Sequence, residues 1–318
     1  MGCGMPCDTV QSEHPPKNFS AAPAVNAMYT TLISAEQVMQ LQQAKTPLML
    51  FDCSFDLARS EAGLAMFAQS HMAGAVFADL DRTLSAKGER QSTDAQSGGR
   101  HPLPPRQALA QWLRDLGFMQ GMQAVVYDRQ GSSFCGRLWW MLRWLGHDAV
   151  AVLDGGLNAW VAAGGSTESG AESAFTVTQT GNFALREPLV KLLQVEEVLE
   201  NLGRAGQTIV DARANPRFKG ELEPLDPVAG HIPGALNRPF QLNLDADGKF
   251  KPPAQLRAEF EALLGVRSTE TVVHHCGSGV TAIPNILAMQ IAGLGNTALF
   301  AGSWSEWCSD PARPVAKG

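Results

Sequence analysis

The sequence has no long apolar run and no basic stretch, and each shortage excludes a class of protein. Its 318 residues carry 25 basic and 31 acidic side chains, a formal net charge of −6, with no prominent run of lysine or arginine. A general nucleic-acid binder would normally show a basic stripe, so that class is excluded. The longest apolar window, residues 283–301, is broken by Asn285, Gln290 and Asn296. It predicts a buried helix and strand, not a membrane span.

Cysteine is also scarce, and the N-terminal segment lacks the apolar core of a secretory signal. We expect residues 1–28 to form a flexible tail on a cytoplasmic protein. Six cysteines in a chain of this size do not make a disulfide scaffold. Cys3 and Cys7 lie in the tail, where exposed thiols without a special role are the favoured interpretation.

Two halves of the chain carry the same landmarks in the same order. LMLFDCS, HMAGAVF, AVVYD and VLDGGLNAW in the first half correspond to TIVDARA, HIPGALN, TVVHHC and LFAGSWSEW in the second. The spacings are nearly constant within two blocks, as a single internal deletion would leave them. This pattern indicates an internal duplication, with its boundary in the Gly/Ser/Glu-rich stretch at 164–173.

Each half alternates strand-like and helix-like segments. LMLFD, AVVYD and AVAVLDG are short apolar runs that predict buried strands, RQALAQWLRDLG predicts an amphipathic helix, and RLWWMLRWLG a buried one. The alternation favours α/β domains with a mainly parallel sheet flanked by helices. We expect a first domain at 29–165, a linker at 166–188 and a second domain at 189–318.

The stretch HHCGSGVTA places Cys276 between an apolar strand-like run and a helix-like run. Ligands of parallel sheets bind at the carboxyl ends of strands, where this cysteine is expected. Gly277 and Gly279 allow backbone amides to turn inward, and such a nest favours a negative charge. A thiol placed there would lose its proton more readily and act as a nucleophile. From these residues alone, a buried cysteine in a glycine turn remains an alternative.

The loop CGSGVT and several longer motifs together resemble the two-domain rhodanese family of sulfurtransferases. The other motifs are HMAGAVFADLD, LWWMLRWLGH, LDGGLNAW, DARANPRFKGELEP, GHIPGALN and GSWSEW. The resemblance runs from about Leu32 to the end of the chain. It implies two tandem rhodanese-like domains, the second catalytic and the first catalytically silent. In agreement, the first half has Asp128 where the second has Cys276.

The implied activity is sulfur transfer by a two-step mechanism. The Cys276 thiolate would take a sulfane sulfur from 3-mercaptopyruvate or thiosulfate, and the persulfide would pass it to cyanide, thioredoxin or another thiol. Such an exchange requires an accessible thiolate. The resemblance implies no metal and no organic cofactor.

The resemblance also assigns substrate-binding residues. Arg217 matches the family arginine that contacts the anionic donor. Around the cysteine, the predicted substrate-binding residues are Gly277, Ser278, Gly279, Val280 and Thr281. Thr281 is also a candidate cap of the following helix. His71 is a possible accessory residue for proton transfer, although its repetition as His231 favours a role in the fold.

One departure leaves the preferred donor open. Where many mercaptopyruvate enzymes have a second arginine, this chain has Leu225, which cannot bind a carboxylate. Thiosulfate-preferring members typically place cations after the cysteine, whereas this chain has Gly277 and Ser278. The balance leans towards mercaptopyruvate.

Three other interpretations of the cysteine are weaker. A cysteine-dependent phosphatase needs an arginine six residues after the cysteine, and position 282 is Ala. A metal site is disfavoured because His274, His275 and Cys276 are consecutive strand residues that point to opposite faces. A non-catalytic persulfide carrier or sensor remains possible, but Cys276 and Arg217 together argue against it.

Overall fold

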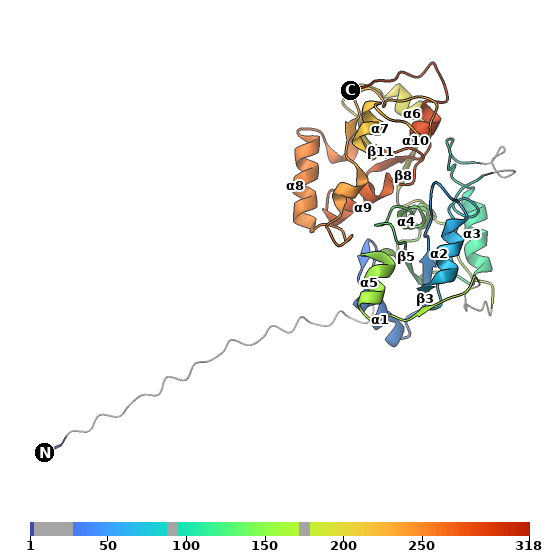
Figure 1. Ribbon diagram of the computed structural model, residues 1–318, viewed down its shortest axis with the longest axis vertical. Coiled ribbons are helices and arrows are strands. Elements are labelled where there is room, and N and C mark those ends of the chain that lie inside the picture. The colour runs from blue at the N-terminus through green and yellow to red at the C-terminus, as the bar shows by residue number, and fades with distance from the viewer. Residues whose placement is uncertain (3–27, 88–94, 172–178) are drawn as a thin grey trace.

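The computed structural model describes residues 1–2, 28–87, 95–171 and 179–318. Most of the predicted tail, including Cys3 and Cys7, therefore lies outside the described residues. Two α/β domains follow one another along the chain, the first blue to green and the second yellow to red in Figure 1. Among the described residues, no helix is both long and apolar enough to cross a membrane.

The two five-stranded sheets have the same strand order, which confirms the duplication. The first sheet runs β1 (Leu32–Ile33), β6 (Val150–Leu153), β5 (Gln123–Tyr127), β2 (Leu48–Asp52) and β4 (Val76–Phe77). The second runs β8 (Lys191–Leu193), β12 (Ala298–Phe300), β11 (Val272–His275), β9 (Thr208–Asp211) and β10 (Leu236–Asn237). All pairings within both sheets are parallel. The predicted α/β class is therefore confirmed.

Helices flank both sheets, as parallel strand connections require. In the first domain they are α1 (Ala35–Gln43), α2 (Ala62–Gln69), α3 (Arg106–Asp115), α4 (Cys135–Trp144) and α5 (Gly156–Ala162). In the second they are α6 (Val195–Glu200), α7 (Asn215–Lys219), α8 (Pro253–Leu264), α9 (Ile283–Ile291) and α10 (Ser303–Trp307). The predicted helices at 106–117 and 137–146 correspond to α3 and α4.

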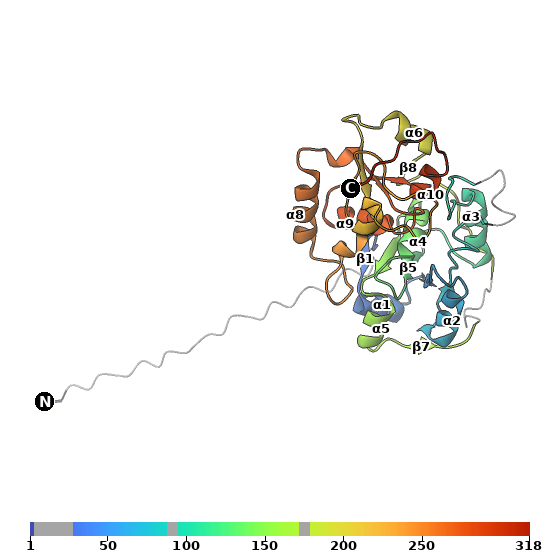
Figure 2. The same ribbon diagram turned by 45° about the horizontal axis from the view of Figure 1, so that its top comes forward.

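The domains meet where α4 packs against α9, and one hydrophobic core extends across this contact. Figures 1 and 2 both show the two helices side by side. A methyl group built on Gly136 would lie 3.2 Å from Ile283 Cγ2, so the helices approach closely at a glycine. The loops that precede α4 and α9 are consequently brought to the domain interface.

The segment predicted as a linker is attached to the first domain along much of its described length. In β7 (Thr167–Glu168) it pairs antiparallel with β3 (His71–Met72). Further on, the amide of Arg186 donates to the Leu145 carbonyl of the first domain at 3.0 Å, and the amide of Leu189, just after the predicted linker, donates to that of Arg143 at 3.0 Å. Because these polar groups pair with the domain, the segment packs as part of it.

His274 lies in the middle of the second sheet with no exposed surface, and its Nε2 is 3.3 Å from Met289 Sδ. Burial lowers the pKa of His274 to about 3, and neighbouring His275 acts in the same direction. The unfolded chain binds a proton on His274 at a higher pH than the folded chain does. The unfolding free energy is therefore highest near neutrality as far as this histidine is concerned, and it decreases as pH falls from about 6.5 towards the folded pKa.

We predict that His274→Leu makes the protein less sensitive to mild acid. Between pH 7.5 and pH 5 the wild type should lose about 2 kcal/mol of unfolding free energy through this histidine. Urea denaturation at both pH values measures the loss, which should be smaller in the variant. This window lies above the titration of ordinary carboxylates. An equal loss in both proteins would contradict the assignment.

Candidate active site

Cys276 lies at the carboxyl end of β11, directly after His275, and α9 begins at Ile283. Pro284 falls in the first turn of α9, where a missing N–H costs little. The cysteine backbone is fixed at both ends: its amide donates to Ser303 Oγ at 3.1 Å, and its carbonyl accepts from the Trp304 amide at 3.0 Å. The Cys276 loop, residues 276–282, therefore starts from a rigid point.

The backbone amides of this loop donate no hydrogen bond within the described part of the chain. None of the six from Gly277 to Ala282 donates to an acceptor in the part of the chain that the structure describes. Buried amides are normally paired, so six consecutive unpaired ones mark a place prepared for an acceptor. The N-terminus of α9 adds its positive dipole end to the same region.

The duplicated first domain shows what such a loop holds. Asp128 occupies the position of Cys276, and its side chain is buried in the corresponding turn before α4. Four backbone amides donate to this one carboxylate at 2.9–3.0 Å, those of Gln130, Ser132, Phe134 and Cys135. In the first domain the loop is thus a cradle for an anion.

The correspondence places Ser278, Val280, Ala282 and Ile283 where those four amides lie. An aspartate places its oxygens two atoms beyond Cβ, and a cysteine persulfide places its outer sulfur two atoms beyond Cβ. The aspartate therefore has the reach of a persulfide anion.

Both glycines of the loop are required by their surroundings. Gly279 has φ +74°, and a Cβ there would lie 2.1 Å from the Ala301 carbonyl oxygen. A Cβ on Gly277 would lie 3.0 Å from Arg100 Nη2 and 3.4 Å from Arg217 Nη1. Gly279 therefore permits the turn, and Gly277 leaves room beside the guanidinium groups.

Arg137, on α4, is a buried cation behind the loop. It donates to the carbonyl oxygens of Gly279 at 3.1 Å and His101 at 2.9 Å, and its side chain has no carboxylate partner among the described residues. Burial lowers the pKa of Arg137 to about 10, while the charge of Cys276 acts in the opposite direction. An uncompensated buried cation favours an anion nearby, here the sulfur at 276.

A second polar chain connects the loop to the first domain. Ser278 Oγ is 2.7 Å from His101 Nδ1, and His101 Nε2 is 3.4 Å from Asp81 Oδ1. Burial lowers the pKa of His101 to about 4, so the ring is neutral near pH 7. Because a carboxylate only accepts, the ring hydrogen faces Asp81 and Nδ1 accepts from the Ser278 hydroxyl. The serine oxygen is left free to accept a proton from a substrate.

Arg217 belongs to an ionic cluster beside Gly277. It donates to Glu223 through Nη2 at 2.7 Å and Nε at 3.2 Å, and its Nη2 is 3.4 Å from Asp226 Oδ2. Asp226 also pairs with Arg100 of the first domain. Glu223 additionally pairs with Arg213, whose guanidinium binds Asp211 at 2.7 Å. Arg213 is thus held in a buried ionic pairing, which indicates a structural role.

The expectation of an accessible thiol is wrong for this conformation, since Cys276 is only 1% exposed. Two guanidinium groups lie beside Gly277, and the Arg100–Asp226 pair joins the domains across this position. These ion pairs hold the two domains together beside the Cys276 loop. A reaction of this thiol with a substrate requires a conformation in which the sulfur is more exposed.

The structure does not bring His71 to this site. Its ring is buried in the first domain, stacked on Phe67 with centroids 3.7 Å apart, and Nδ1 lies 2.8 Å from the Phe67 carbonyl oxygen. His231 repeats these contacts with Phe218 at 3.8 Å and 2.8 Å. The repeated histidine stabilises both domains alike.

One further expectation is corrected. Thr281 does not cap α9, because Ala282 occupies the N-cap without a side-chain hydrogen bond. Leu225, which stands where the second arginine was expected, lies in an irregular segment and is 46% exposed. Among the described residues, no group of three or more potential ligands could hold a metal.

Sequence reasoning missed Asp81, Arg100, His101 and Arg137, all from the first domain. Arg137 had a detectable signal, because it is a charged residue near the start of a mostly apolar helix. The other three come from irregular segments without a periodic pattern. They become recognisable only when the domains are docked.

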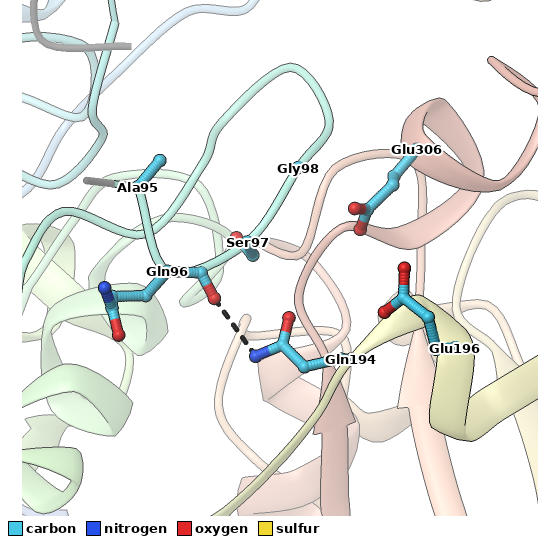
Figure 3. Close-up of a pocket in the computed structure, with 7 residues that line it drawn as sticks. All are labelled: Ala95, Gln96, Ser97, Gly98, Gln194, Glu196 and Glu306. Carbon is cyan, nitrogen blue, oxygen red and sulfur yellow. Dashed lines mark hydrogen bonds between the residues drawn. The ribbon is translucent and has the colours of Figure 1, made fainter. Parts of the chain in front are cut away.

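A hollow of about 520 Å³ lies between the domains near Arg100, lined by residues 95–98, Gln194, Glu196 and Glu306. Figure 3 shows the first-domain loop of this hollow linked to the second domain by Gln194, which donates to the Gln96 carbonyl at 3.2 Å. The carboxyl groups of Glu196 and Glu306 lie on the opposite side. Burial raises the pKa of Glu306. This acidic lining does not favour an anionic substrate, which we place instead at the arginines.

The geometry defines a class: a two-domain α/β protein with a cysteine in an anion-binding loop. Residues 34–163 and 194–310 match the family model described as Rhodanese-like domain. The chain belongs to the rhodanese family, and its fold is that of two rhodanese-like domains, as predicted.

Known relatives define its enzyme class. A Pseudomonas aeruginosa protein named "Probable 3-mercaptopyruvate sulfurtransferase" is 44% identical, covering 90% of this chain and 100% of the relative. Bovine thiosulfate sulfurtransferase is 32% identical, covering 88% and 92%. The solved structure of SseA from Escherichia coli is 31% identical, with a TM-score of 0.71 and coverage of 87% and 100%. The chain is a sulfurtransferase.

We predict that Gly279→Ala impairs sulfur transfer by distorting the loop. The added Cβ would meet the Ala301 carbonyl oxygen at a distance no real contact tolerates. Gly295→Ala is the matched control, because Gly295 also has a positive φ, +85°, but open space around its Cβ position. Steady-state kinetics should show at least a ~10-fold lower kcat for the first variant, equivalent to about 1.4 kcal/mol, and little change for the second. Equal effects would attribute the loss to backbone strain alone.

Proposed function

We propose that the protein transfers sulfur from 3-mercaptopyruvate to a thiol through a persulfide on Cys276. The observation that carries this proposal is the set of six unpaired amides following Cys276, compared with the amide-bound Asp128 carboxylate. An anion two atoms beyond Cβ is what this loop accommodates. The buried charge of Arg137 supports the same anion.

In the first half-reaction, the Cys276 thiolate attacks the donor sulfur. A sulfur–sulfur bond forms, the bond between C3 and sulfur breaks, and its electron pair remains on C3 as the enolate of pyruvate. The proton of the donor thiol must reach C3. Ser278 Oγ, hydrogen-bonded to neutral His101, is placed to accept and return it, and Asp81 orients the ring. The products are pyruvate and the Cys276 persulfide anion.

In the second half-reaction, an acceptor thiolate attacks the outer sulfur. The new bond joins the acceptor to that sulfur, and the Cys276 thiolate leaves with the electron pair of the broken bond. Cyanide would accept the sulfur in the same way and leave as thiocyanate. A small thiol protein such as thioredoxin is the acceptor class we favour. The cytoplasmic location of the protein stays a prediction. Thiosulfate, the donor in the name of the bovine relative, is the alternative substrate.

Cys276→Ser should abolish turnover while the fold is retained, because a hydroxyl cannot hold a transferable sulfur. Wild-type protein incubated with 3-mercaptopyruvate and no acceptor should gain one sulfur atom by intact mass, and the variant none. A Cys3→Ser/Cys7→Ser double variant is the control for other thiols and should still gain the sulfur. Turnover by the Cys276→Ser variant, or a sulfur found on another cysteine, would overturn the mechanism.

Ser278→Ala should distinguish the two donors. Release of pyruvate requires a proton at carbon, whereas release of sulfite from thiosulfate does not. Loss of the proton path should lower kcat for 3-mercaptopyruvate by about 10- to 100-fold, at the low end of general acid–base effects. The rate with thiosulfate, measured on the same preparation, should change by less than about 3-fold. A parallel fall for both donors would show that Ser278 acts only in shaping the loop.

A further inference from the structure

Arg100 reaches the site from the first domain and has no place in the mechanism so far. Its amide donates to Ser305 Oγ, on α10, at 3.0 Å, so the backbone is anchored to the second domain. Its side chain is 30% exposed and pairs with Asp226. An arginine held in this way is positioned by both domains at once.

Two guanidinium groups converge on one point. A methyl group on Gly277 would lie within 3.0 Å of Arg100 Nη2 and 3.4 Å of Arg217 Nη1. Gly277 directly follows Cys276, so this point lies one residue from the reacting cysteine. Paired guanidinium groups bind carboxylates well because their planar N–H groups match the carboxylate oxygens.

A carboxylate of the protein already pairs with both guanidinium groups. Asp226 accepts a hydrogen bond from Arg100 at Oδ1 and one from Arg217 at Oδ2, and its side chain is only 3% exposed. It follows Leu225, the position where a second donor-binding arginine was expected. The chain thus lacks the expected arginine but brings another from the opposite domain.

We infer that Arg100 and Arg217 form the binding site for the donor's carboxylate, and that Asp226 fills this site until the donor displaces it. The inference rests on the proposed function and specifies its substrate recognition. Arg100 takes the place of the arginine missing at position 225. Asp226 acts as an internal competitor that also covers Cys276.

Charge favours a donor with one negative charge at this point. The cluster contains three cations, Arg100, Arg213 and Arg217, and three anions, Asp211, Glu223 and Asp226. When Asp226 leaves, one positive charge is uncompensated. A monocarboxylate such as 3-mercaptopyruvate restores neutrality, whereas the thiosulfate dianion adds an excess negative charge in a poorly solvated place.

The same exchange would open access to the sulfur. The Arg100–Asp226 pair joins the two domains beside Gly277, which follows a cysteine that is 1% exposed. Breaking this pair removes an electrostatic link across the domain interface next to the Cys276 loop. Donor binding and exposure of Cys276 are therefore coupled, which limits reaction of the thiol with other electrophiles.

The test compares Arg100→Met with a matched control, Arg257→Met, an arginine on α8 that is 45% exposed and paired with Glu261. Arg100→Met should raise KM for 3-mercaptopyruvate by about 10- to 100-fold, the loss of one charge-assisted hydrogen bond, with kcat within about 2-fold. Arg257→Met should leave both unchanged. Adding Leu225→Arg to Arg100→Met should recover most of the KM loss, because it returns a cation to the neighbourhood.

Asp226→Asn tests the competitor without any donor. The rate at which iodoacetamide alkylates Cys276, located by peptide mapping, should rise several-fold over wild type because the cover is released. KM for 3-mercaptopyruvate should fall in the same variant. Unchanged alkylation and unchanged KM would overturn the role of Asp226.

The outcomes separate this inference from the proposed function. If wild-type protein gains no sulfur from either donor, the proposed function fails, whatever the variants do. If the wild type gains sulfur and Arg100→Met keeps its KM, the function stands and the role of Arg100 is refuted. A fall in kcat without a rise in KM would also refute it, since it would point to loop distortion and not to donor binding.

Discussion

The site depends on one arrangement: a strand that ends in a loop of inward backbone amides at the start of a helix. Both halves of the chain build it at the same place in the same sheet order. In the first half the loop is satisfied permanently by the Asp128 carboxylate. In the second, Cys276 leaves the amides without an acceptor among the described residues. The duplication therefore gave one loop whose amides are paired internally and one whose amides, in our proposal, are paired by an anionic sulfur.

In our proposal the first domain contributes to the chemistry, although it has Asp128 and not a cysteine at the position of Cys276. Its α4 places Arg137 behind the Cys276 loop, and its irregular segment places His101 and Arg100 beside Ser278 and Gly277. These groups are held by backbone carbonyls and by ion pairs that cross the interface. A rigid contact between α4 and α9 keeps them in register. Domain docking thus assembles the site, as is common where catalytic groups come from different elements.

In our account, the same charged groups keep Cys276 buried and bind the carboxylate of the donor. Asp226 neutralises Arg100 and Arg217 in a place with little access to water, where an unpaired charge is costly. A substrate carboxylate can replace it at little electrostatic cost, while a neutral molecule cannot. A thiol kept covered by this exchange would react mainly with donors that carry the right anion.

The sequence by itself determined the duplication, the parallel α/β architecture and the position of Cys276 at a strand end. It could do so because hydrophobic periodicity and glycine-rich turns are local properties. It also indicated Arg217 through a motif. Only the tertiary structure decided that Arg100, His101 and Arg137 join the site, that His71 does not, and that Cys276 is covered. Those facts depend on how two domains pack, and contacts between residues distant in the chain leave no periodic trace in either segment.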